Sequence, residues 1–133
     1  MSLLIGIVIV AHGGLAREYL AAIEHVVGAQ SGIEAISIAA EHDRPAKQAE
    51  ICSAAESVDS GDGVVVVTDM FGGSPSNLSL MACQPAGRRI LYGANLPMLI
   101  KLAKSRNKSV GDAVRAAMDA GRKYIDSQNI SNT

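Results

Sequence analysis

A histidine and an aspartate each follow an apolar run of the chain, at the point where a strand would end. His12 comes just after the run Leu4–Val10 and precedes two glycines, and Asp69 directly follows the run Gly63–Thr68. Histidine suits a nucleophile or a base because its charge changes near neutral pH. A carboxylate that accepts the Nδ1 proton fixes the tautomer of the ring and leaves Nε2 available for attack. The pattern therefore indicates a nucleophilic or basic histidine, His12, oriented by Asp69.

Both residues also have a simpler interpretation. A single histidine at a strand end can be purely structural, and an aspartate in the same place can cap a turn. The other histidines do not decide between the two, because His25 falls within a helical pattern and His42 within a polar loop. The three histidines lack the spacing of a metal site such as HExxH, so we expect no metal ion and no other cofactor.

A glycine-rich loop follows Asp69, and its composition suits an anion. Gly72, Gly73 and Ser74 offer backbone amides and a hydroxyl that can donate to phosphoryl oxygens. Gly13 lets the backbone after His12 approach the same ligand closely. Ser74 before a proline is also an ordinary helix start, and the two interpretations are compatible. Motifs for nucleotide and serine-hydrolase chemistry, GxxxxGK[ST], GxGxxG and GxSxG, are absent.

Three short apolar runs rich in valine and isoleucine and a weaker fourth run are predicted strands, and helical patterns lie between them. The strands are expected at Leu4–Val10, Ile33–Ala39, Gly63–Thr68 and Arg88–Ala94. The helices are expected at Leu15–Gly28, Arg44–Val58, Ser74–Cys83, after Asn95, and at Val110–Ile125. The first and third strands are almost continuously apolar, which is typical of a parallel sheet covered on both faces. The alternating order predicts a doubly wound α/β sandwich, in which the residues that follow the strands meet at one edge.

The composition fits a single folded domain. The chain has 133 residues, and 48% of them are hydrophobic, which excludes an intrinsically disordered protein. A net charge of -1 and an aromatic content of 3% argue against nucleic acid binding. We expect the domain at residues 1–126 and a polar tail at 127–133. The basic stretches Arg88-Arg89 and Lys101 to Lys108 are expected to be solvated surface.

The two cysteines and the apolar run near the N-terminus indicate the cellular compartment of the protein. Cys52 and Cys83 lie outside any metal or redox motif and are expected to be free thiols, as in a reducing cytoplasm. The apolar run near the N-terminus is too short to span a bilayer and lacks the flanks of a signal peptide. A cytoplasmic protein is therefore expected.

Three segments resemble the mannose-type enzyme IIA domain of the bacterial phosphoenolpyruvate-dependent sugar phosphotransferase system. They are IGIVIVAHGG at Ile5–Gly14, TDMFGGSPSN at Thr68–Asn77 and GANLPML at Gly93–Leu99. The resemblance covers Leu4 to Ile125 and implies a mainly parallel four-stranded sheet in the order 2-1-3-4. Some members of the family are homodimers in which a C-terminal segment, here Tyr124 to Ile130, adds an antiparallel strand to the partner.

The resemblance implies a phosphoryl relay. The phosphocarrier HPr would phosphorylate His12 at Nε2, and His12 would pass the group to a IIB component that serves a membrane permease. Asp69 would orient the histidine by a hydrogen bond. The phosphoryl group would be surrounded by Gly13, Gly72, Gly73 and Ser74. A rim that docks the two partners is expected at Met70, Phe71, Asn95, Leu96, Pro97 and Met98, although core packing is an equal alternative for Leu96 and Met98.

Two other functions fit the same residues. Because the chain stops after a short polar tail instead of continuing into a IIB domain, a stand-alone IIA is expected. Such a protein can be regulatory, with the phosphorylation state of His12 read by a target protein and no sugar transported. A metal-free hydrolase built on His12 and Asp69 is the remaining alternative, but the motifs supply no second acid or nucleophile.

Overall fold

Four strands form the sheet that carries the predicted site. They are β1 (Gly6–His12), β2 (Ile33–Ile38), β3 (Val64–Thr68) and β4 (Arg88–Leu91). All neighbouring pairs are parallel, in the order β2-β1-β3-β4. The computed structural model describes residues 4–132. The strand order and the parallel pairing confirm the fold class predicted from the sequence.

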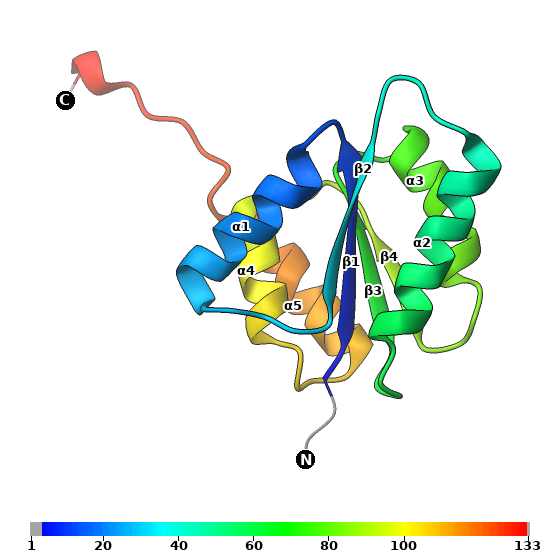
Figure 1. Ribbon diagram of the computed structural model, residues 1–133. Helices are drawn as coiled ribbons and strands as arrows, with labels where there is room; N and C mark the ends of the chain where they lie inside the picture. The colour runs from blue at the N-terminus through cyan, green and yellow to red at the C-terminus, as the bar shows by residue number, and fades with distance from the viewer. Residues whose placement is uncertain (1–3, 133) are drawn as a thin grey trace.

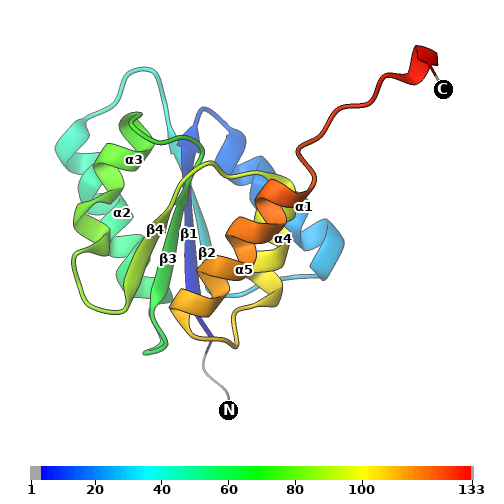
Figure 2. The same cartoon turned by 180° about the vertical axis from the view of Figure 1, so that it is seen from behind.

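Helices cover both faces of the sheet (Figure 1). On one face lie α1 (Leu15–Val27), α4 (Leu96–Lys104) and α5 (Val110–Lys123). On the other lie α2 (Arg44–Val58), α3 (Ser74–Ser79) and the short 3-10 helix η1 (Met81–Cys83), as the reverse view in Figure 2 also shows. Because both faces are covered, the central strands need no polar side, and every residue of β3 is buried.

Side chains that alternate along β1 divide the core in two. Ile7 packs with Leu99 in the cluster under α1, α4 and α5. Val8 points the other way and packs with Ile51 in the cluster under α2 and α3. This arrangement explains why the first strand is apolar without interruption. It also fixes β1 rigidly, so that the residue at its carboxyl end is held in place.

Several boundaries differ from the predicted ones. The predicted helix Ser74–Cys83 is divided, because the N–H of Leu80 donates to the carbonyl of Asn77 three residues back and the backbone tightens into η1. β1 extends through His12, so the histidine is the last residue of the strand. β4 ends at Leu91 and α5 at Lys123, both before the predicted ends.

The C-terminal tail leaves the body of the protein after α5 (Figure 1). It contains one short 3-10 helix, η2 (Ile130–Asn132), and no strand within its described residues. Its antiparallel strand therefore stays a prediction, since it requires a partner. Residues 1–3 and 133, which belong to the ends of the predicted domain and tail, lie outside the described residues.

The basic stretches are not simply solvated surface, because each contains one arginine whose side chain is buried. Arg106 closes the amino edge of the sheet: its Nε donates to the carbonyl of Ile5 at 2.7 Å, and its Nη2 donates to that of Gly32 at 3.3 Å. Its own carbonyl accepts the N–H of Ile5. Burial lowers the pKa of the Arg106 guanidinium, which finds carbonyls there instead of a carboxylate.

Arg88 links three elements, with a side chain that is only 4% exposed. Its Nη2 donates to Glu56 at 2.9 Å and to Asp59 at 3.2 Å, and its Nη1 donates to the carbonyl of Ala82. Burial lowers the pKa of Arg88, but the hydrogen bonds and charges of Glu56 and Asp59 outweigh it and leave the pKa raised. Arg88 thus joins β4 to the end of α2 and to η1.

Candidate functional site

His12 lies at the carboxyl edge of the sheet, at the end of β1. Its side chain is 48% exposed although the six strand residues before it are buried. The chain turns away immediately afterwards, because Gly13 adopts a positive φ of 55° that a glycine tolerates. The N–H of Gly13 donates to the carbonyl of Ile38, which ties this turn to the end of β2. The imidazole is therefore presented to solvent by a rigid strand.

Asp69 holds His12 by two hydrogen bonds to the same oxygen. Oδ2 accepts from the ring Nδ1 at 2.8 Å and from the backbone N–H of His12 at 3.0 Å. The register explains the contact, since Val10 pairs with Thr68 and brings the ends of β1 and β3 together. The structure thus places two residues 57 positions apart in direct contact, as predicted from the strand ends.

The charge of Asp69 fixes the tautomer of the ring. Its side chain is 11% exposed, and this burial raises its pKa, but the hydrogen bonds and the charge of His12 outweigh it and leave the pKa below the usual carboxyl value. An ionised carboxylate only accepts hydrogen bonds, so Nδ1 carries the proton. In the neutral imidazole, Nε2 then has a free lone pair.

The loop between β3 and α3 lies against this nitrogen. A Cβ placed on Gly73 would be 3.2 Å from Cε1 of His12 and 3.6 Å from Nε2, so any larger residue there would press on the imidazole. Gly72 has a φ of 86°, in the left-handed region that favours glycine. Gly72 thus serves the turn of the loop, and Gly73 its close approach to the ring.

The predicted phosphoryl donors differ in their availability. The N–H of Gly13 is bonded to Ile38 and that of Gly72 to the hydroxyl of Ser76 at 2.9 Å. Within residues 4–132, the amides of Gly73 and Ser74 and the Ser74 hydroxyl have no hydrogen-bond partner. The structure thus leaves the donors of Gly73 and Ser74 available to an anion and engages the other two amides.

Exposed apolar side chains border the site. Met70 and Phe71 are both exposed, and Phe71 rests edge-on against Tyr92 with ring centroids 4.9 Å apart. Leu15, the first residue of α1, is also exposed. These side chains present an apolar surface that water leaves readily when a protein docks.

The rest of the predicted rim is mostly structural. Asn95 caps α4 by accepting the N–H of Met98, and its Nδ2 donates to the carbonyl of Gly121 in α5. Met98 is 6% exposed and belongs to the core, which corresponds to the packing alternative. Leu96 and Pro97 are half-buried. The side chain of Met98 packs against Gly121 of α5 and lines the pocket beside β4, so it is not part of the exposed apolar surface formed by Met70, Phe71 and Leu15.

The comparisons with known proteins agree with this geometry. The profile of the EIIA-man family, described as PTS system fructose IIA component, matches residues 6–118. The chain belongs to the EIIA-man family. It is therefore an EIIA-type component of the phosphotransferase system, and the family predicted from the three motifs is confirmed.

Relatives of known name support the EIIA-man assignment. The chain is 27% identical over 124 residues to the "PTS system mannose-specific EIIAB component" of Escherichia coli (strain K12). This match covers 91% of the chain but 38% of that relative, so the chain spans well under half the length of the curated relatives it matches.

Solved structures resemble the whole chain. The phosphotransferase system component EIIA from Streptococcus agalactiae is 26% identical with a TM-score of 0.81, over 97% of this chain and 99% of that one. The mannose/sorbose specific IIA subunit from Enterococcus faecalis is 25% identical with a TM-score of 0.83, over 98% and 97%.

Three residues around His12 and its loop were not predicted from the sequence of this EIIA-man chain. Ser76 is buried and bonds the glycine loop, Tyr92 supports Phe71, and Leu15 adds to the exposed apolar rim. Tyr92 follows β4 at the carboxyl edge, which was a usable signal. The signal for Ser76 was weaker: it is a hydroxyl residue four positions after Gly72, close enough in sequence to bond the backbone of the turn.

The other histidines stay apart from the site chemistry. His25 is exposed within α1, and Nδ1 of His42 lies 3.0 Å from the carbonyl of Ala39. Across the described part of the chain, no three His, Cys, Asp or Glu side chains are grouped as metal ligands. None of the helices within residues 4–132 combines the length and apolar character needed to cross a bilayer.

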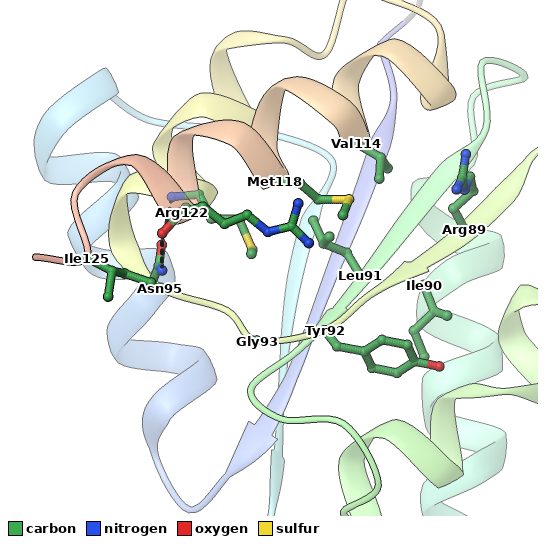
Figure 3. A pocket seen from close by; sticks show the side chains of 12 residues that line it. Arg89, Ile90, Leu91, Tyr92, Gly93, Asn95, Val114, Met118, Arg122 and Ile125 are labelled. Carbon is green, nitrogen blue, oxygen red and sulfur yellow. Dashed lines mark hydrogen bonds between the residues drawn. The ribbon is translucent and has the colours of Figure 1, made fainter.

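A pocket of about 420 Å³ lies away from His12, between β4 and the end of α5 (Figure 3). It is lined by side chains such as Arg89, Met118, Arg122 and Ile125. The dashed bond in Figure 3 joins Asn95 to Gly121 at its border. This pocket follows the edge of the sheet that β4 leaves unpaired within the described residues.

Proposed function

We propose that this protein is a phosphoryl carrier that accepts a phosphoryl group from phosphorylated HPr on Nε2 of His12 and passes it to a IIB component. The observation that carries the proposal is the pair of hydrogen bonds to Oδ2 of Asp69, at 2.8 and 3.0 Å. These bonds hold the proton on Nδ1 and leave Nε2 exposed and nucleophilic. The relay would work in the cytoplasm beside a permease.

The transfer needs no metal or nucleotide in this chain. The lone pair of Nε2 attacks phosphorus, and the bond between phosphorus and the donor atom breaks with its electron pair remaining on the donor. Because Nδ1 keeps its proton, the phosphorylated ring gains positive charge, which the carboxylate of Asp69 stabilises. In the second transfer the bond from Nε2 to phosphorus breaks, its electron pair returns to Nε2, and the acceptor holds the phosphoryl group.

Two features serve the phosphoryl group and the partners. The unbonded amides of Gly73 and Ser74 and the Ser74 hydroxyl donate to its oxygens, beside the place that phosphorus occupies on Nε2. Met70, Phe71 and Leu15 form the apolar contact for both partners, which dock in turn. An exposed site suits this exchange because each partner must reach the same nitrogen.

The test is a reconstituted relay with phosphoenolpyruvate, enzyme I and HPr. We expect one acid-labile phosphate per chain, absent in His12→Ala. His25→Ala and His42→Ala are the matched controls and should keep the label, because neither residue belongs to the site. Adding a mannose-type IIB component should remove the phosphate from the wild-type protein. Stable labelling of His12→Ala would contradict the assignment.

We also propose that the protein is a homodimer in which the tail of one chain pairs with β4 of the other. The tail leaves the body of its own chain (Figure 1), and Tyr124 and Ile125 are exposed on it. The edge of β4 has no neighbour in the described sheet, and a pocket runs along it. An unpaired edge beside an extended segment that carries exposed apolar side chains favours strand addition.

A further inference from the structure

The glycine pair of the loop has four backbone polar groups, and three of them are bonded. The N–H of Gly72 donates to Oγ of Ser76. The carbonyl of Gly73 accepts from the same Oγ at 3.1 Å and from the N–H of Asn77 at 3.0 Å. The carbonyl of Gly72 lies 3.5 Å from Nδ2 of Asn77. The N–H of Gly73 is the fourth, and it has no partner within residues 4–132.

One side chain makes two of these bonds. The hydroxyl of Ser76 both accepts from Gly72 and donates to Gly73, and the residue is only 3% exposed. It therefore uses its full donor capacity and one acceptor position on the loop alone. Burial of this hydroxyl costs free energy unless such partners are present, so the hydroxyl and the loop hold each other in one arrangement.

We infer that Ser76 is a positioning residue for phosphoryl transfer, which sets the glycine loop against His12 so that the Gly73 amide faces the incoming phosphoryl group. The inference rests on the proposed function and deepens it. Ser76 acts through the loop and does not touch the histidine. Its two bonds hold the Phe71–Gly72 and Gly73–Ser74 peptide units, which flank the unit that carries the Gly73 N–H. A Cβ placed on Gly73 would lie 3.6 Å from Nε2 of His12.

Rigidity matters at this place because Gly72 and Gly73 are the residues with the most conformational freedom in the unbound loop. Without the Ser76 bonds, the two glycines would sample other conformations, and the Gly73 amide would be misaligned for part of the time. Oriented donors are effective in transfer because they need no rearrangement during the reaction. The effect should appear in the rate of transfer, while docking of HPr on the apolar rim is retained.

The test compares Ser76→Ala with Ser79→Ala in the reconstituted relay. Ser79 is a matched control, because it is buried in the same helix and its hydroxyl donates to the carbonyl of Pro75, away from the glycine loop. We expect the rate at saturating phosphorylated HPr to fall roughly tenfold in Ser76→Ala, with the half-saturating HPr concentration unchanged. Ser79→Ala should transfer at the wild-type rate. Ser76→Thr retains the hydroxyl and should transfer close to the wild-type rate.

Circular dichroism and melting temperatures establish that each variant is folded before its rate is compared. Faster hydrogen exchange at the Gly72 amide in Ser76→Ala, but not in Ser79→Ala, would support the inference. A folded Ser76→Ala that transfers as fast as Ser79→Ala would overturn it, as would a raised half-saturating concentration with an unchanged rate. Failure of the wild-type protein to take up phosphate would instead refute the proposed function, so the two failures are distinguishable.

Discussion

Asp69 uses one of its two oxygens for both hydrogen bonds to His12. Oδ2 accepts from the ring and from the backbone, whereas Oδ1 is buried without a partner among the described residues. The backbone N–H therefore fixes which oxygen faces the ring. An asparagine at position 69 would accept both hydrogen bonds with its carbonyl oxygen. The opposite orientation of its amide is disfavoured, because the NH₂ group would then face the backbone N–H of His12, and both are donors. Substitution at Asp69 can therefore separate two effects: the orientation of the His12 ring by hydrogen bonds and the negative charge beside it.

Replacing Asp69 tests this separation in the transfer assay. Asp69→Ala removes orientation and charge, and we expect transfer to slow by on the order of 10²–10⁴-fold while the protein remains folded. Asp69→Asn keeps orientation and loses charge, so its rate should lie between those of Asp69→Ala and the wild type. Single-turnover transfer from phosphorylated HPr measures both. An unchanged rate in Asp69→Ala would remove the carboxylate from the mechanism.

The pH dependence follows from the same carboxylate. Because the pKa of Asp69 is lowered in the folded protein, its hydrogen bonds contribute stability that is fully present above the usual carboxyl pKa of 3.8. That contribution is lost as the pH falls through the lowered value. Asp69 is accordingly ionised throughout the neutral pH range.

At the scale of residues, the His12–Asp69 pair was predictable from the sequence, but the hydrogen bonds of Ser76 to the neighbouring glycine loop were not. His12 and Asp69 were predictable because each follows a buried strand, and parallel strands bring their carboxyl ends together. Ser76 was missed because nothing in the spacing shows that a helix turns its hydroxyl back toward the glycines. Met98 was proposed for the rim, but its side chain faces the core, and the direction of a side chain in the first turn of a helix depends on packing.

The elements divide the molecule into a reactive edge and a supporting edge. The carboxyl ends of the strands carry the site, whereas Arg88 and Arg106 lie at their amino ends. Arg88 joins β4 to α2 and η1 through Asp59, Glu56 and the carbonyl of Ala82. Glu56 is 71% exposed, so its pair with Arg88 contributes little, and the other two bonds carry the effect.

Replacing Arg88 should therefore lower stability without changing transfer. Arg88→Met keeps much of the apolar side chain and removes the hydrogen bonds, and we expect the free energy of unfolding to fall by about 1–3 kcal/mol. Urea denaturation measures this change. Arg89→Met is the control on the same strand, because Arg89 is exposed. An equal decrease in the free energy of unfolding in both variants would show that the hydrogen bonds of Arg88 do not stabilise the fold.

The sequence indicated the elements better than their ends. Continuous runs of valine and isoleucine mark β1 and β3 clearly, since both faces are buried. The division of the third predicted helix at Leu80 was not predictable, because helical apolar spacing continues across it and only the tightened hydrogen bonds reveal the break. The burial of Arg88 and Arg106 was missed because charge alone suggests solvent exposure.

The assembled molecule is proposed to be a dimer joined by its tails. A protein that ends after Lys123 should be a monomer in analytical ultracentrifugation, whereas the full chain should be a dimer. The shortened protein should still accept phosphate, because His12 and Asp69 come from one chain. Ile125→Glu replaces an exposed apolar side chain of the tail, beside β4, with a charge and should weaken the dimer as well. A monomeric full chain, or a shortened protein that remains a dimer, would contradict the proposal.

The bonds of Arg106 have a consequence for synthesis on the ribosome. The strand that carries His12 is made before the other strands of the sheet, yet its amino end is completed by a residue 101 positions later. Its neighbour β3 and the orienting carboxylate also emerge well after it. Until β3 has been made, the apolar strand β1 lacks one of its two neighbours in the sheet. It is then an exposed apolar segment of the kind that chaperones protect from aggregation. Nascent chains stopped before residue 69 cannot form the His12–Asp69 pair, so the histidine gains its orienting carboxylate only after the 57 residues that follow it have been made.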